Sequence, residues 1–177
     1  EELERLALQR CSTAREAIKL MDKLTKEYGY GDDGECLTIA DPNEVWHFEI
    51  FGEGPDKVGA VWAAVRIPDD HVGVSANVPR ISTLNLSDTA NYMASDNVYE
   101  VAKKMDLWDG KGEFKFWKAY AGGNYFDEPK AYSVREYYIL NKIAPSLGAS
   151  GKRETGKTAF CRRCYVSSYR DLRGVGA

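Results

Sequence analysis

The sequence contains few of the residues on which metal sites and disulfide frameworks depend. Only two histidines, His47 and His71, and four cysteines occur among 177 residues. Four cysteines spread through a chain long enough to bury a core do not indicate the framework of a small secreted domain. The chain also opens at Glu1 without an initiator Met or a charged-then-apolar leader, so we expect further sequence upstream. The sequence indicates neither a cytoplasmic nor an exported location.

An excess of positive charge and long apolar runs are also absent. Lys and Arg number 24 against 27 Asp and Glu, which gives a net charge of −3. A dedicated nucleic-acid-binding protein carries a strong cationic excess, so nucleic acid is not an expected partner. Apolar stretches such as Gly59–Ile67 are less than half of the roughly 20 residues that a membrane-spanning helix needs. We therefore expect one folded domain without a membrane span.

The first 30 residues have the spacing of an amphipathic helix. Apolar residues recur every three or four positions from Leu3 to Tyr30. Ser12 or Thr13 together with Glu16 matches a capping box, the signature of a helix start. This pattern predicts two helices with a break near Cys11.

Four short segments have strand character and are separated by turn sequences. They are Cys36–Ala40, Glu44–Phe51, Gly59–Ile67 and Val72–Ala76. Consecutive strands joined by short turns predict an antiparallel meander. In the second strand, Trp46 and Phe48 alternate with His47 and Glu49, whereas the third strand is apolar at nearly every position. We therefore expect the third strand to be covered on both faces.

Helical patterns follow the predicted sheet. After a polar loop, helical spacing is found in Asn97–Met105, Phe114–Tyr120 and Val134–Ala144. Helices before and after a meander predict an α+β fold with helical layers packed on antiparallel sheet. From residue 148 the apolar periodicity is lost. We expect residues 148–177 to be an atypical tail, produced by a misread frame or a gene-fragment end.

Two motifs in this tail suggest ligands but lack the required context. Cys161 and Cys164 have the spacing of a zinc-binding pair, yet no second pair is present. The run from Gly151 to Gly156-Lys157-Thr158 satisfies the bare phosphate-loop expression, but no buried strand precedes it. We expect no metal site and no cofactor.

A more specific feature lies where the fourth predicted strand enters a loop. Asn77 and Arg80 occur there. A strand end can hold an Asn amide rigidly enough to donate a hydrogen bond to a developing oxyanion. The alternative is a turn-forming Asn before Pro79. His47, His71 and Glu49 are interpreted as structural or solvated, because no catalytic constellation follows from their spacing.

Six sequence blocks, in this order, resemble the PepD-like cysteine dipeptidases of the N-terminal nucleophile hydrolase superfamily. The blocks are Thr13–Ala17, Ile39–Trp46, Lys57–Trp62 with Val65–Asp69, Ala76–Ile81, Phe114–Tyr120, and Ser133–Tyr137 with Ala144–Leu147. The resemblance extends from Leu6 to Leu147. It implies that residues 1–147 form part of a dipeptidase domain with a four-layer αββα fold, incomplete in this chain.

The resemblance also implies an activity and site residues. Family members hydrolyse dipeptides with an N-terminal Cys thiol, whose own α-amino group is the base and which forms an acyl-enzyme. Asn77 matches the oxyanion-stabilising Asn, and Arg135 corresponds to a late active-site Arg. Arg80 is the candidate substrate-binding residue.

The nucleophile itself is expected upstream of Glu1. Neither Cys11, in a predicted helix, nor Cys36, at a strand start, fits that role, so this chain alone should be inactive. Two alternatives stay open: a non-catalytic relative that keeps the fold for binding, and a nucleotide-binding protein that uses Lys157. Dipeptide specificity and homo-oligomerisation are also left open by the sequence.

Overall fold

The computed structural model describes residues 1–55, 57–75 and 79–120. It also describes short pieces at 138–139, 142–143, 153–154, 157–158 and 169–171. The described helices are too short or too polar to cross a bilayer.

Two helices open the chain, as the sequence predicts. Helix α1 spans Glu2–Arg10, and helix α2 spans Ala14–Tyr28. The capping box between them is formed: the Thr13 hydroxyl accepts the Glu16 N–H at 3.2 Å, and the Glu16 carboxylate accepts the Thr13 N–H at 3.2 Å. Because the first turn of a helix leaves its N–H groups without helical partners, these bonds explain why α2 begins here.

Four antiparallel strands form the main sheet. In spatial order they are β1 (Glu35–Ala40), β2 (Val45–Gly52), β3 (Ala60–Ile67) and β5 (Tyr92–Ala94). The first three follow one another along the chain as the predicted meander. Phe48 of β2 lies opposite Leu37 of β1 and Ala64 of β3.

The fourth predicted strand does not continue this meander, so that part of the prediction is wrong. Strand β4 is short, His71–Gly73, and pairs with β8 (Tyr169–Asp171). The place beside β3 is taken by β5, in a segment that the sequence did not predict as a strand. The Asp88 carbonyl accepts the N–H groups of Asn91 and Tyr92 at 3.1 and 2.9 Å, and this turn leads the chain into β5. A strand of three residues is too short to give an alternation signal.

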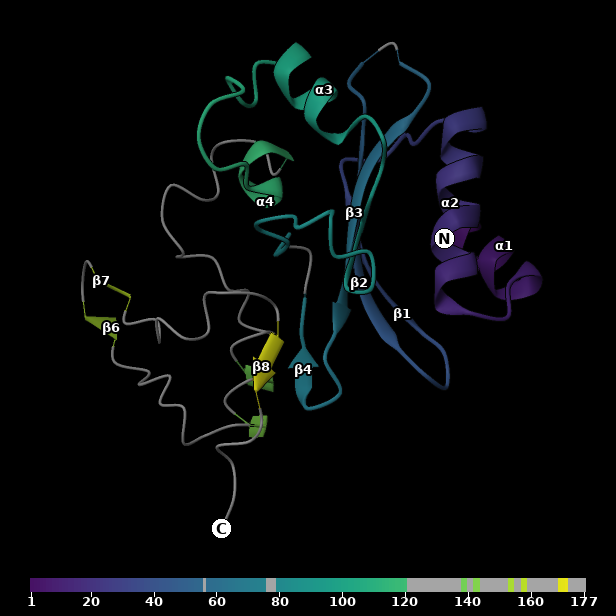
Figure 1. Cartoon of the computed structure of the whole chain (residues 1–177), viewed down its shortest axis with the longest axis vertical. Helices are drawn as coiled ribbons and strands as arrows, with labels where there is room; N and C mark the ends of the chain where they lie inside the picture. Colours follow the sequence, from purple (N-terminus) through teal and green to yellow (C-terminus); the bar gives the residue numbers. More distant parts are fainter. Residues whose placement is uncertain are drawn as a thin grey trace.

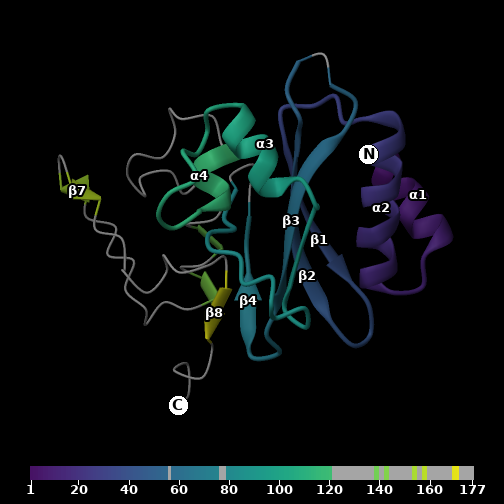
Figure 2. The ribbon, with the colours of Figure 1, turned by 45° about the horizontal axis from the view of Figure 1, so that its top comes forward.

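Two more helices follow within the predicted segments. Helix α3 spans Val98–Lys104, and helix α4 spans Phe116–Tyr120. Figures 1 and 2 show α1 and α2 on one face of the main sheet and α3 and α4 on the other. The prediction of an α+β fold with helices packed on antiparallel sheet is therefore confirmed. The third predicted helix, Val134–Ala144, lies for the most part outside the described residues.

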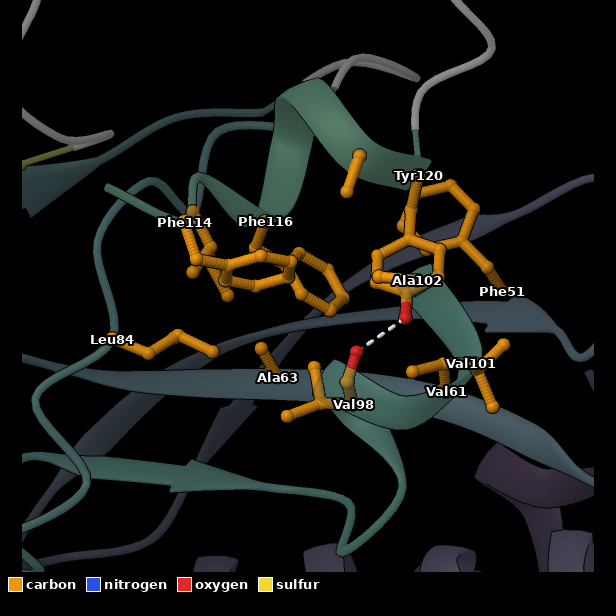
Figure 3. Packing of buried hydrophobic residues seen from close by; sticks show 12 residues of the cluster. Phe51, Val61, Ala63, Leu84, Val98, Val101, Ala102, Phe114, Phe116 and Tyr120 are labelled. Atoms are coloured by element: carbon orange, nitrogen blue, oxygen red, sulfur yellow. Dashed lines mark hydrogen bonds between the residues drawn. The ribbon is translucent and has the colours of Figure 1, made fainter. Parts of the chain in front are cut away.

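The main sheet separates two hydrophobic cores. Trp62 and Ala64 of β3 belong to the core beneath α1 and α2, whereas Val61 and Ala63 belong to the core beneath α3 and α4. All four are buried, which confirms that β3 is covered on both faces. Figure 3 shows the second core, where aromatic rings from α4 and its approach pack over β3.

Candidate active site

Two polar side chains are buried in the middle of β2, on the face turned away from α1 and α2. Trp46 and Phe48 point into the core beneath those helices, so strand alternation turns His47 and Glu49 to the opposite face, together with Phe51. His47 is 2% exposed and Glu49 is 0% exposed. Polar groups buried this deeply need hydrogen-bond partners.

The Glu49 carboxylate accepts hydrogen bonds from three residues. Its Oε1 lies 2.7 Å from Nε2 of His47 and 3.0 Å from the backbone nitrogen of Ile81. The backbone N–H of Arg80 also donates to Oε1, and Oε2 lies 3.2 Å from the Ile81 nitrogen. The His47 contact is a hydrogen bond in the tautomer that carries its proton on Nε2. Glu49 thus links β2 to a segment 31 residues further along the chain.

The same segment is held from its other side by α4. The N–H of Trp117 donates to the Ile81 carbonyl at 2.9 Å, and the N–H of Phe116 donates to the Ser82 carbonyl at 3.0 Å. These donors belong to the first turn of α4, whose N–H groups have no partner within the helix. Residues 80–82 therefore have their backbone fixed between β2 and α4.

A cysteine lies beside this pair. Cys36 is directly opposite Glu49 across β1 and β2, and the donor atoms of Cys36, His47 and Glu49 lie within 4.8 Å of one another. A thiolate, an imidazole and a carboxylate can bind zinc, and they are also the parts of an activated cysteine nucleophile. The Glu49 oxygens, however, already accept backbone N–H groups. The arrangement is therefore best explained as a hydrogen-bonded anchor rather than an ion site.

The structure describes only one of the three predicted site residues. Arg80 is half-buried, and its backbone N–H is one of the Glu49 donors. Asn77 and Arg135 lie outside the described residues. Asn77 precedes Arg80 by three positions in the sequence.

The remaining candidate residues fall elsewhere. His71 begins β4 and bonds through Nδ1 to the adjacent Asp70 at 2.6 Å, which fits the structural interpretation. Lys157 lies in β7 (Lys157–Thr158), which pairs with β6 (Arg153–Glu154). A phosphate loop would instead lead into a helix. Cys161 and Cys164 lie outside the described residues.

A groove of about 510 Å³ lies on the opposite side of the sheet. It is lined by α1, α2, the loop between them and β1, and includes Cys11. Burial raises the pKa of the Cys11 thiol, which disfavours the nucleophilic thiolate. Arg80, the one predicted site residue within the part of the chain that the structure describes, does not line this groove.

The role of Glu49 was ambiguous in the sequence, although its position in β2 indicates a buried carboxylate. Glu49 is the one acidic residue within a strand that is otherwise apolar on one face and contains Phe51 and His47 on the other. A carboxylate in such a strand must find donors inside the fold. What the sequence could not supply was their identity, because the donors are backbone N–H groups of a distant segment.

The sequence also matches the profile of peptidase family C69 over residues 1–165. The chain belongs to this family. The match to family C69 reaches beyond Leu147, where the sequence blocks end. The division of the chain at residue 147 stays a prediction.

Several relatives of this C69 chain carry dipeptidase names. It is 35% identical to a probable dipeptidase from Salmonella dublin over 146 residues, which are 82% of the chain and 32% of that protein. It is 31% identical to a probable dipeptidase from Latilactobacillus sakei over 80% of the chain and 28% of that protein. A probable dipeptidase B from Lactococcus lactis subsp. lactis (strain IL1403) is 36% identical over 57% of the chain and 20% of that protein. The chain thus spans about a third or less of the length of these curated relatives.

Proposed function

We propose that this chain is part of a dipeptidase that hydrolyses dipeptides through an N-terminal Cys located upstream of Glu1. The observation that carries the proposal is membership of peptidase family C69 over residues 1–165. The names of its relatives support dipeptides as the substrate class. The small share of those relatives that the chain spans agrees with a nucleophile outside it.

The proposed reaction proceeds through a thioester. The thiol sulfur attacks the peptide carbonyl carbon while its proton passes to the α-amino group of the same cysteine. The leaving amine takes that proton as the C–N bond breaks, and water then hydrolyses the thioester and regenerates the thiol. In both steps a negative charge develops on the carbonyl oxygen. A donor fixed at that oxygen accelerates both steps.

Three residues of this chain have roles in the proposal. Asn77 donates its amide to the oxyanion, and Arg80 binds the substrate. Arg135 contributes a second cation to the site. The support for Asn77 is the resemblance of the Ala76–Ile81 block to the family, in which the matching Asn stabilises the oxyanion.

The four-layer αββα arrangement is also part of the proposal. In that arrangement, α1 and α2 would form one helical layer, and the main sheet beneath them would form one of the two sheet layers. The second sheet and its helices would come from sequence outside the described residues.

The test is turnover of dipeptides by the protein extended upstream through its N-terminal Cys. We expect hydrolysis of a dipeptide panel by that protein, loss of turnover when this Cys is changed to Ala, and no turnover by residues 1–177 alone. Dipeptide binding without turnover by the extended protein would favour a non-catalytic relative and contradict the proposal. Robust turnover by residues 1–177 would contradict the upstream nucleophile.

A further inference from the structure

We propose that the outer edge of β1 is an interaction surface at which two copies of this chain pair, with β1 of one copy antiparallel to β1 of the other. This inference goes beyond the proposed function and does not depend on it. It rests on the edge of the main sheet, on the groove beside that edge and on the charges of α1.

Strand β1 is an edge strand among the strands that the structure describes. In the main sheet it pairs with β2 on one side, over six consecutive residue pairs and without a bulge. Residues 35–40 include no Pro and no Lys, the residues that commonly protect an open sheet edge. An edge strand without such protection is a template on which a further strand can pair.

The hairpin between β1 and β2 shows which backbone groups face this edge. The Asp41 N–H donates to the Glu44 carbonyl at 3.0 Å, so these two residues form a hydrogen-bonded pair. Because hydrogen-bonded and non-hydrogen-bonded pairs alternate along an antiparallel ladder, the pair of Thr38 with His47 is a non-hydrogen-bonded one. The N–H and C=O groups of Thr38 therefore point away from β2, toward the open edge.

A two-fold axis at Thr38 gives β1 a self-complementary register. Thr38 then lies opposite Thr38 of the second copy, and the two residues exchange N–H···O=C hydrogen bonds across the axis. Leu37 lies opposite Ile39 of the second copy, and this apolar pair occurs twice because a two-fold contact repeats every pair. Both side chains lie on the sheet face that packs against α1 and α2. Cross-strand apolar pairs of this kind stabilise a sheet.

The groove beside β1 adds apolar surface on the same face. It has a volume of about 510 Å³ and is lined by Ala7 and Leu8 of α1 and by residues 37–40 of β1. Leu8 is 86% exposed. With the two-fold axis perpendicular to the sheet, both α1 helices lie on one face of the joined sheets, on either side of the axis. The second copy then covers apolar side chains that water contacts in the single chain.

The charges of α1 complement those of a second copy in this orientation. Glu2 and Glu4 lie in the first turn of α1, and Arg10 lies in its last turn. The two-fold axis reverses the direction in which one α1 runs along the sheet relative to the other. The acidic turn of each helix therefore approaches the turn that carries Arg10 of the other copy, and the two helix dipoles are antiparallel.

The pairing should be weak and reversible. Only one short strand and one short helix of each copy take part, and small interfaces form transient complexes. Beyond the paired residues, Glu35 lies opposite Asp41 of the second copy, and this like-charge contact opposes association. We therefore expect a monomer–dimer equilibrium in the micromolar range.

The first experiment is sedimentation equilibrium of the 177-residue chain over the micromolar range. We expect a reversible dimer in the wild type. Thr38→Lys places two like charges directly opposite each other and should raise the dimer dissociation constant by at least about tenfold. The matched control is Thr89→Lys, at an exposed turn residue, which should leave that constant unchanged. A wild type that stays monomeric, or a folded Thr38→Lys variant with unchanged affinity, would overturn the proposal.

The second experiment tests the register and stays decisive if Thr38→Lys fails to fold. In a hydrogen-bonded antiparallel pair the Cα atoms are about 5.5 Å apart, which a disulfide can span. Mild oxidation of the Thr38→Cys variant should therefore link two copies through position 38, as mass spectrometry of the digested dimer would show. Thr89→Cys should give no link through position 89. A folded Thr38→Cys variant that forms no link through position 38 would overturn the proposal.

Discussion

The Asp41 carboxylate accepts the backbone N–H of Ala14 at 2.8 Å, so the turn after β1 holds the first residue of α2. The other Asp41 oxygen accepts the N–H groups of Asn43 and Glu44 at 2.7 and 3.0 Å. These bonds, with that of Ala14 the largest cause, hold the pKa of Asp41 below its usual value. One side chain thus shapes the turn between β1 and β2 and fastens α2 to the sheet.

Asp41→Ala should lower the melting temperature at pH 7 by about 2–4 °C, because it removes all three bonds. A carboxyl whose folded pKa is depressed stabilises above its unfolded pKa of about 3.9, and this stabilisation is lost as the pH falls through the folded value. The difference in melting temperature between wild type and Asp41→Ala should therefore become smaller when the melting curves are repeated near pH 3. Asp33→Ala, in an exposed turn, is the control. An equal difference in melting temperature at both pH values would contradict a stabilising role for the Asp41 charge.

A second prediction concerns the core beneath α3 and α4. The Tyr120 hydroxyl donates to the Val98 carbonyl at 2.5 Å, as Figure 3 shows, and burial raises the pKa of Tyr120 so that it stays protonated. Tyr120→Phe should lower the free energy of unfolding by about 1–2 kcal/mol, since a buried carbonyl loses a donor. Urea unfolding measures this difference. Tyr99→Phe, at a half-buried ring of the same core, should change stability by less than about 0.5 kcal/mol, and an equal loss in both variants would refute the assignment.

The third prediction separates the two interpretations of Asn77. If its amide stabilises the oxyanion, Asn77→Ala in the extended protein should lower kcat by about a hundredfold to a thousandfold and leave KM nearly unchanged. If Asn77 only forms a turn before Pro79, the variant should lose thermal stability and keep a normal kcat. Both quantities should be measured on one preparation, with Asn43→Ala as the control in an exposed turn. A stable variant with unimpaired kcat would remove Asn77 from the active site.

Arg80 allows its side chain to be tested apart from its backbone. Arg80→Ala keeps the N–H that donates to Glu49, so the anchor should survive. Loss of a charged hydrogen-bonding partner for the substrate should raise KM about 10-fold or more, with a smaller change in kcat. Steady-state kinetics with the extended protein, and Arg10→Ala as an exposed control, check this. An unchanged KM would exclude Arg80 from substrate binding.

Much of the fold could be predicted because its signals are local. Thr13 and Glu16 lie three residues apart, and their capping-box spacing predicted the start of α2. The alternation of Trp46 with His47 fixed the two faces of β2. These elements were predicted within one or two residues of their observed ends. The family resemblance came from ordered blocks and was confirmed by the match to family C69.

The predictions that were wrong or incomplete concern residues whose hydrogen-bond partners are distant in the sequence. Tyr92–Ala94 is a strand only because β3 offers it an edge, and its three residues carry no pattern of their own. Val72 was expected to continue the meander but belongs to β4, which pairs with β8 nearly a hundred residues later. Glu49 was ambiguous for the same reason, because its donors at Arg80 and Ile81 are set by the tertiary fold. The roles of Asn77 and Arg135 remain predictions.

The most direct test of the central claim is to find which cysteine carries the acyl group. The extended protein would be trapped during turnover of a slowly hydrolysed substrate, digested and mapped by mass spectrometry. The account predicts one acyl adduct, on the N-terminal Cys upstream of Glu1, and none on Cys11 or Cys36. An adduct on Cys36, which lies beside the buried His47 and Glu49, would contradict it and make these three residues the catalytic centre.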